Sequence, residues 1–158
     1  MPHRSSRKFL CLVDPTPECR VAIRFAARRA EATRGHVVLL YVIESADFHH
    51  WMAVEAKMRE EAYKEAERAL YEAAAIVNQT YGGRPELMIR EGQPREEIAN
   101  LVAEDRSISI LVLGAGTGKE GPGPIISGLL AGEFGRHFPI PITIVPGGRS
   151  EAEIDTLG

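Results

Sequence analysis

Several features that define specialised classes of protein are scarce in this sequence. Only two cysteines, Cys11 and Cys19, occur among the 158 residues, which is too few for a disulfide framework. No further Cys or His stands at the short spacing that a cysteine-based metal site needs. No apolar run approaches the roughly 20 residues of a membrane-spanning helix. Aromatic residues make up 6% of the chain, so the core must be mainly aliphatic.

The sequence also has no excess of basic residues over acidic ones. Lys and Arg number 19 against 22 Asp and Glu, which gives a net charge of −3. A nucleic-acid binder that works by neutralising phosphates is therefore not expected. The basic start of the chain precedes a short apolar run that Asp14 interrupts, and this run is too short for the core of a signal peptide. We therefore expect a cytoplasmic protein with reduced thiols and no membrane partner.

What the chain does contain is a regular alternation of two hydrophobic patterns. Continuous apolar runs, typical of strands buried on both faces, alternate with segments in which apolar residues recur every three or four positions, as in helices. Hydrophobic residues make up 44% and charged residues 26% of the chain, the balance of a soluble globular domain. We expect strands at 9–13, 37–43, 86–90, 109–113 and 140–145, and helices at 17–34, 53–80, after 94 and at 125–137.

This alternation predicts an α/β fold: a single five-stranded parallel sheet, Rossmann-like, with helices on both faces. Thr16 is expected to cap the first helix, Pro17 to occupy its first position and Gly35 to follow its end. The third strand is less apolar and is expected near an edge of the sheet. The domain is expected to span 7–147, with 148–158 as a loose polar tail.

Five of the 15 glycines lie between residues 114 and 123, directly after the fourth expected strand. This is not a P-loop, because Gly114 and Gly118 enclose three residues rather than four and Glu120 stands where that motif has Ser or Thr. A dinucleotide-type Gly-x-Gly-x-x-Gly pattern begins at Gly116, but prolines after it prevent an immediate helix. Two interpretations stay open: a loop whose amides surround phosphates, and a crossover loop without a ligand.

Asp14 follows the first strand as the glycine loop follows the fourth. The carboxyl ends of parallel strands meet at one edge of a sheet, where ligands bind if the strand order reverses between neighbours. Asp14 and the glycine loop therefore share one crevice if strands one and four are neighbours. Asp14 is equally well explained as a turn or capping residue before Pro15.

These residues, together with Arg136-His137-Phe138-Pro139-Ile140-Pro141 before the last strand, resemble the universal stress protein family over residues 7–147. The family's nucleotide signature is Gly, two residues, Gly, nine residues, Gly, and then Ser or Thr. Gly118 and Gly128 enclose nine residues and match its second and third glycines. Position 129, however, is Leu129 rather than Ser or Thr.

The first glycine of the signature also departs from the pattern. Ala115 stands at its position, and the use of Gly114 requires one inserted residue. Leu129 cannot donate the hydrogen bond to phosphate that a hydroxyl makes in the family's ATP-binding members. Ser127 could replace that hydroxyl only in a shifted helix register. We therefore expect that Leu129→Ser would raise ATP affinity if the site is otherwise intact.

The resemblance implies an adenine nucleotide alpha-hydrolase-like fold and a small stress-response module that binds ATP, with or without magnesium, or another adenine nucleotide. It implies that the adenosine lies near Asp14 and the backbone of Val42 and that the phosphates lie near the glycine loop. It also implies a homodimer through strand 140–146. The nucleotide-binding residues expected from it are Asp14, Pro15, Val42, Gly114, Gly116, Gly118, Ser127, Gly128 and Leu129.

Two further functions stay open beside nucleotide binding. The alternative within the family is a homodimeric interaction protein that binds no nucleotide and contacts an unknown protein partner. An enzyme of phosphoryl chemistry would need a metal site, which the sequence does not provide. No catalytic residues are expected, so any ATP hydrolysis would be slow.

The remaining candidates have structural explanations. His49-His50-Trp51 suggests a metal ligand or a cap over the crevice, but adjacent histidines diverge and surface packing is the simpler interpretation. His137 fits the C-terminus of a helix, where its partial charge is favourable. Cys11 is expected to be inert in a buried strand.

Overall fold

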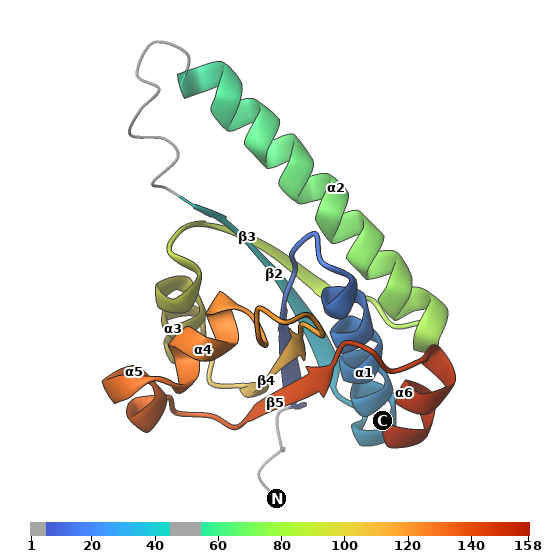
Figure 1. Cartoon of the computed structure of the whole chain (residues 1–158). Coiled ribbons are helices and arrows are strands. Elements are labelled where there is room, and N and C mark those ends of the chain that lie inside the picture. Colours follow the sequence, from blue (N-terminus) through green and yellow to red (C-terminus); the bar gives the residue numbers. More distant parts are fainter. Residues whose placement is uncertain (1–5, 45–54) are drawn as a thin grey trace, which may run out of the picture.

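The computed structural model, which describes residues 6–44 and 55–158, is a five-stranded parallel sheet with helices on both faces (Figure 1). The strand order is β3-β2-β1-β4-β5. This confirms the expected α/β fold, the edge position of the third strand and the pairing of the first strand with the fourth. The elements are β1 (Lys8–Leu12), α1 (Pro17–Thr33), β2 (His36–Glu44), α2 (Glu55–Tyr81), β3 (Glu86–Gly92), α3 (Pro94–Glu104), β4 (Ile108–Ala115), α4 (Pro124–Leu130), α5 (Gly132–His137), β5 (Ile142–Pro146) and α6 (Glu151–Leu157).

The sheet separates two buried clusters, because successive side chains of a strand point to opposite faces. Phe9 and Cys11 of β1 pack with α1 and α2 in one cluster, whereas Leu10 packs with α3 and α4 in the other. Figure 1 shows α1, α2 and α6 on one side of the sheet and α3 and α4 on the other. The core is mainly aliphatic, with Phe9 as the one aromatic side chain among its buried hydrophobic residues in the described chain.

The ends of α1 follow the sequence signals closely. Thr16 caps the helix by accepting a hydrogen bond from the Cys19 backbone N–H at 3.3 Å, and Pro17 is its first residue, as predicted. Gly35 follows the C-cap, as expected, but the left-handed backbone lies at Arg34, with φ of 56°. Gly35 has a different requirement, since a Cβ there would lie 2.5 Å from the Arg7 carbonyl oxygen.

The single helix expected at 125–137 is wrong, because the structure contains two short helices there. Ala131 is extended, with φ of −88° and ψ of 145°, and ends α4. Gly132 then takes a left-handed conformation with φ of 57°, which glycine adopts without steric cost. The apolar spacing continues across this break, so hydrophobic periodicity alone did not reveal it.

The loose tail expected at the C-terminus is also wrong, since residues 151–157 form α6. Ser150 and Glu153 form a reciprocal capping box at its start, which satisfies two backbone donors. Ile154 is 1% exposed and joins the cluster on the α1 face of the sheet. One apolar residue within a polar segment is a weak pattern, and for that reason the docking was missed.

Asp155 fastens α6 to α1 through two arginines. Its carboxylate accepts hydrogen bonds from Arg24 Nε and Nη2 at 2.8 Å and from Arg28 Nε at 2.9 Å. Hydrogen bonds from Arg24 first, and then from Arg28, hold the pKa of the Asp155 carboxyl well below its usual range.

Candidate functional site

A crevice lies where β1, β2 and β4 end at the carboxyl edge of the sheet. It consists of two adjoining cavities of about 470 and 190 Å³, both lined by Leu12, Asp14, Pro124 and Ile125. The strand order places this crevice where connections leave β1 and β4 in opposite directions, the position at which open α/β sheets bind ligands. We refer to these two cavities together as the crevice.

Four of the expected nucleotide-binding residues line the crevice. Asp14, Pro15 and Val42 line the larger cavity, and Gly114 joins Asp14 in the smaller one. These residues come from three different strands, and the pairing of β1 with both β2 and β4 brings them together. A Cβ on Gly114 would lie 2.1 Å from the Glu18 carbonyl oxygen, so glycine here allows α1 to approach β4.

Asp14 forms a local turn at the start of α1. Its Oδ1 accepts hydrogen bonds from the Thr16 backbone N–H at 3.0 Å and from the Thr16 hydroxyl. The interpretation of Asp14 as a turn residue is therefore confirmed, while Thr16 is the cap of α1. Its Oδ2 has no hydrogen-bond partner within the described ranges 6–44 and 55–158. The carboxylate lines both cavities, so a second role toward a ligand remains compatible with the turn.

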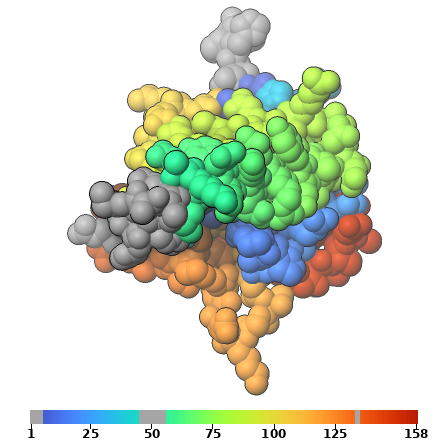
Figure 2. All heavy atoms as spheres, turned by 90° about the horizontal axis from the view of Figure 1, so that it is seen from above, coloured from blue at the N-terminus to red at the C-terminus, as the bar shows by residue number. Residues whose placement is uncertain are grey.

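The glycine loop after β4 folds back on itself. The Gly116 N–H donates to the Pro122 carbonyl oxygen at 3.1 Å, and the Gly121 N–H donates to that of Gly118 at 3.3 Å. Residues 117–122 are exposed and form the orange projection at the bottom of Figure 2. Gly116 and Gly118 therefore do not line the crevice in this conformation, and the Gly116 amide is already engaged.

The other three expected residues lie on α4, beyond the crevice. Because α4 begins at Pro124, it places Ile125 and Ile126 at the smaller cavity. Ser127 is exposed and Gly128 contacts Arg95, whose Nη1 donates to its carbonyl oxygen at 3.4 Å. Leu129 is 0% exposed and belongs to the core under α3 and α4. Its side chain serves packing, so replacing it with Ser would change the core before it changed any ligand site.

Acidic side chains that the sequence did not reveal give the crevice its charge. Glu44 lies at the end of β2, Glu65 projects from α2 and Glu18 lies in the first turn of α1. With Asp14 they make four carboxylates, and among the described residues no Lys or Arg lines either cavity. The position of Glu44 after an apolar strand was a usable signal, whereas nothing in the long α2 pattern distinguished Glu65.

Arg68, which lies on α2 and lines neither cavity of the crevice, partly neutralises this negative charge. Its Nε donates to Glu65 Oε2 at 3.0 Å and its Nη1 donates to Glu72 Oε1 at 2.8 Å. The hydrogen bonds from Arg68 lower the pKa of the Glu65 carboxyl. Glu65 therefore stays ionised at neutral pH, and the field in the crevice is negative.

Neither thiol is available as a nucleophile. Cys11 is fully buried in β1, as predicted, and burial raises its pKa well above the usual value. Cys19 lines the smaller cavity, but burial raises its pKa to about 12. Its Sγ accepts a hydrogen bond from the Asp14 N–H at 3.4 Å. Cys19 thus supports the turn that carries Asp14.

The described part of the chain holds neither a cluster of metal ligands nor a membrane-spanning helix. Within 6–44 and 55–158, no three His, Cys, Asp or Glu side chains are grouped as a metal ion requires. None of the helices in these ranges combines the length and apolar character needed to cross a bilayer. His49-His50-Trp51 lies outside the described residues.

Solved structures with the same architecture include several universal stress proteins. UspA from Lactobacillus plantarum superimposes with a TM-score of 0.72 at 19% identity, covering 90% of this chain and 99% of that one. A universal stress protein in complex with cAMP gives 0.64 at 16%, covering 91% and 99%. The Archaeoglobus fulgidus protein in complex with dAMP gives 0.56 at 21%, covering 89% and 98%. At these identities the likeness concerns the fold.

The family assignment comes from the sequence itself. No curated protein matches the chain. The sequence model of the Universal stress protein family, however, matches residues 5–146, which is nearly the whole of the chain before α6. This confirms the resemblance drawn from Asp14, the glycine loop and the segment before β5, and the chain belongs to the universal stress protein family.

Proposed function

We propose that this protein binds an adenine nucleotide in the crevice, and that binding rather than turnover is its biochemical activity. The observation that carries the proposal is the meeting of Asp14, Pro15 and Val42 around one cavity of about 470 Å³. That volume is within the range of pockets that hold nucleotide-sized ligands. Two related structures are named as complexes with cAMP and dAMP, which supports an adenine ligand here.

The adenosine part fits the larger cavity. Its walls include Pro15, Val42 and Ile125, which offer apolar surface to a purine. The Asp14 Oδ2 has no hydrogen-bond partner in the described part of the chain and is a suitable acceptor for a ribose hydroxyl. A carboxylate that accepts a hydrogen bond from a hydroxyl in a partly buried site makes a strong hydrogen bond.

The charge of the crevice favours a ligand with few phosphates. The four carboxylates of Asp14, Glu18, Glu44 and Glu65 would repel the polyanionic tail of ATP. The partly buried Asp14 and Glu18 contribute most, because their charges are screened less than those of the exposed Glu44 and Glu65. Binding of phosphate by the Gly116 amide would also require its hydrogen bond to Pro122 to open. We therefore expect adenosine monophosphates to bind more tightly than ATP, with or without magnesium, and any hydrolysis to be slow.

Calorimetry with adenosine, AMP, cAMP and ATP tests the proposal, with GMP as the control for the base. We expect measurable heat from the adenine monophosphates and a weaker signal from ATP. Asp14→Asn keeps an oxygen that can accept from the Thr16 N–H but removes the carboxylate. It should weaken AMP binding about tenfold with little change in melting temperature. Absence of heat from every adenine ligand at millimolar concentration would contradict the proposal.

A nucleotide-free interaction protein is the second candidate, and the closed glycine loop favours it. The loop is held by its own Gly116–Pro122 hydrogen bond and projects into solvent, where a protein partner could reach it. In that case the same calorimetry gives no heat, and truncation of the loop tip abolishes capture of the partner without altering the melting temperature.

We also propose that the protein forms a cytoplasmic homodimer through residues 140–146. β5 is the last strand of the sheet, and Ile144 on it is 37% exposed. An apolar, unpaired edge strand normally requires cover. Light scattering should give twice the mass of 17.3 kDa for the unaltered chain and the monomer mass for Ile144→Lys; a monomer in both would refute it.

A further inference from the structure

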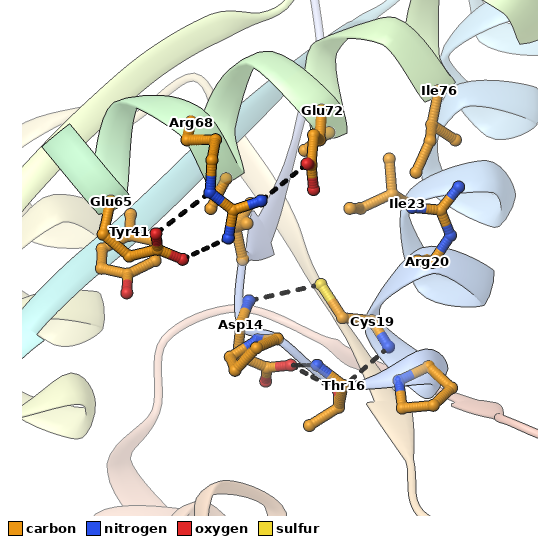
Figure 3. Close-up of a pocket in the computed structure, with 15 residues that line it drawn as sticks. Asp14, Thr16, Cys19, Arg20, Ile23, Tyr41, Glu65, Arg68, Glu72 and Ile76 are labelled. Atoms are coloured by element: carbon orange, nitrogen blue, oxygen red, sulfur yellow. Dashed lines mark hydrogen bonds and ion pairs between the residues drawn. The ribbon is translucent and has the colours of Figure 1, made fainter.

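A second hollow, which we name the α1–α2 groove, lies beside the Asp14–Pro17 turn on the face of the sheet that α1 and α2 cover. It encloses about 380 Å³ between the first turns of α1 and the middle of α2 (Figure 3). This volume falls in the range of sites for small organic molecules. Its apolar lining is contributed by Val13, Ile23, Tyr41, Ala69, Ala73 and Ile76.

The carboxylates of the α1–α2 groove are already engaged. Arg68 binds both Glu65 and Glu72 across the roof of the groove, and Thr16 donates to Asp14 (Figure 3). Besides the Asp14 Oδ2, two polar groups of the lining remain open. In the part of the chain that the structure describes, neither the Arg20 guanidinium nor the Tyr41 hydroxyl has a hydrogen-bond or ion-pair partner. Figure 3 shows Arg20 near Ile23 and Ile76, and Tyr41 at the opposite side near Glu65.

Unlike the neighbouring arginines Arg24 and Arg149, Arg20 has no ion-pair partner among the described residues and is available to bind a ligand. A further cavity of about 240 Å³ continues the α1–α2 groove toward α6 and shares Pro17, Arg20 and Ile76 with it. Arg24 and Arg149 also line that cavity, but Asp155 binds Arg24 at 2.8 Å and Glu153 binds Arg149 at 3.0 Å. A free guanidinium beside apolar surface presents two parallel N–H donors that match a carboxylate.

We propose that the α1–α2 groove is a binding site for a small organic anion with an apolar body. The carboxylate of the ligand pairs with Arg20, its body covers Ile23 and Ile76, and a hydrogen-bonding atom at its far end reaches the Tyr41 hydroxyl. The α1–α2 groove adjoins the larger cavity of the crevice, and the two share the lining residues Val13, Asp14, Pro15, Tyr41 and Glu65. It differs from the crevice in carrying Arg20 and Arg68, and the proposal does not rest on nucleotide binding.

Amide chemical-shift mapping with 1-naphthoate tests the proposal, and 1-naphthylmethylamine, which has the same ring and the opposite charge, is the control ligand. We expect 1-naphthoate to shift amides of α1 and of α2 from 65 to 76, with a dissociation constant on the order of a millimolar. The amine should leave these amides unshifted. Guanosine and other uncharged aromatic compounds should bind no better than the amine.

Two variants separate the role of Arg20 from a general effect of charge. Arg20→Gln should weaken 1-naphthoate at least about tenfold with an unchanged melting temperature, because Arg20 has no partner to lose in the described residues. Arg106→Gln removes an exposed arginine before β4 and should leave affinity unchanged. Tyr41→Phe should weaken a naphthoate with a polar substituent more than 1-naphthoate itself.

Three outcomes would overturn the assignment. They are equal shifts from 1-naphthoate and the amine, unchanged affinity in Arg20→Gln, and shifts confined to Val42 and Gly114 in the crevice. The last outcome would assign the anion to the crevice. AMP binding is measured separately, so failure here leaves the nucleotide proposal standing, and the reverse also holds.

Discussion

The crevice and the α1–α2 groove lie on two sides of the same Asp14 turn but offer different chemistry. Asp14 and Glu65 line both hollows. The crevice adds Glu18 and Glu44 and has no Lys or Arg in its described lining, whereas the α1–α2 groove adds two arginines, Arg20 and Arg68, beside Glu72. One is therefore acidic throughout, and the other carries a free cation.

This difference separates what the fold decides from what individual side chains decide. The crevice exists because β1 and β4 are neighbours and their connections diverge, which is a property of the strand order. Much of the charge that distinguishes the two hollows comes from helix side chains, Glu18 and Arg20 on α1 and Arg68 and Glu72 on α2, which can change without altering the sheet. If the proposed sites bind ligands, topology locates them and helix surface residues select among the ligands.

The largest effect is expected from Leu129→Ser, which tests whether the crevice can be given a phosphate-binding hydroxyl. Leu129 is 0% exposed in the core, so we expect a loss of about 2–5 kcal/mol of unfolding free energy and no gain in ATP affinity. Leu130, which is 57% exposed, is the matched control, and Leu130→Ser should stay within about 0.5 kcal/mol. Urea unfolding measures both. A stable Leu129→Ser variant with tighter ATP binding would mean that α4 moves when nucleotide binds.

Glycines on the crevice side give the next largest effect. Gly114→Ala would bring a Cβ within 2.1 Å of the Glu18 carbonyl oxygen, and separating α1 from β4 should cost about 1–3 kcal/mol. Gly118→Ala meets nothing within 4 Å and should change stability by less than about 0.5 kcal/mol. Thermal unfolding compares them. Since Gly118 lies at the tip of a closed loop, AMP affinity should also be unchanged in Gly118→Ala; a clear loss would indicate that the loop opens over the ligand.

Most of the fold was predictable from the sequence because it depends on strong patterns. Continuous apolar runs and helical spacing identified every strand and the main helices, and Thr16 with Pro17 identified the start of α1. The two errors arose where a single residue decides the outcome. The extended backbone at Ala131 ends α4 inside continuing apolar spacing, and Ile154 docks α6 within an otherwise polar segment.

The site was predictable only in part, for a physical reason. Asp14 and Pro15 follow β1, whereas Val42 and Gly114 lie near the carboxyl ends of β2 and β4, and the strand order alone brings them together. Acidic residues on helix surfaces, such as Glu65, carry no such signal, because exposed charges are common and their neighbours depend on helix orientation. The same holds for Arg20, whose importance comes from the absence of a partner in the described residues.

A smaller effect, on binding rather than stability, is expected from Glu18→Gln. Glu18 lines the smaller cavity, and its Oε1 would lie 3.4 Å from a Cβ on Gly116, close to where phosphates would approach. Removing this charge should raise ATP affinity about three- to tenfold and leave adenosine unchanged in calorimetry. Glu67→Gln, which removes an exposed acid of α2 beside β3, is the control and should change neither. If Glu18→Gln raised the affinity for adenosine as much as that for ATP, repulsion between Glu18 and the phosphates would not be what limits ATP binding.

The smallest effect is expected from Arg68→Gln, which acts on both hollows at once. The substitution frees Glu65, which lines both, and Glu72, which lines the α1–α2 groove. The affinities for AMP and for 1-naphthoate should each fall about two- to threefold, while the affinity for 1-naphthylmethylamine should rise. Lys64→Gln is the control, because Lys64 pairs with Glu60 and lines neither hollow.

The pH dependence of Arg68→Gln has a definite direction. Arg68 lowers the pKa of Glu65, so in the variant this pKa rises back toward the ordinary glutamate value of 4.5. The freed carboxylate is therefore ionised at pH 7, where the loss of anion affinity is complete, and the loss fades as the pH falls toward that value. Titrations of AMP and of 1-naphthoate at pH 7 and at pH 5 should show the loss of affinity in Arg68→Gln, because both pH values lie above the pKa of Glu65 in the variant. If Arg68→Gln weakened only 1-naphthoate, Glu65 would act on the α1–α2 groove alone, and the negative field of the crevice would come from Asp14, Glu18 and Glu44.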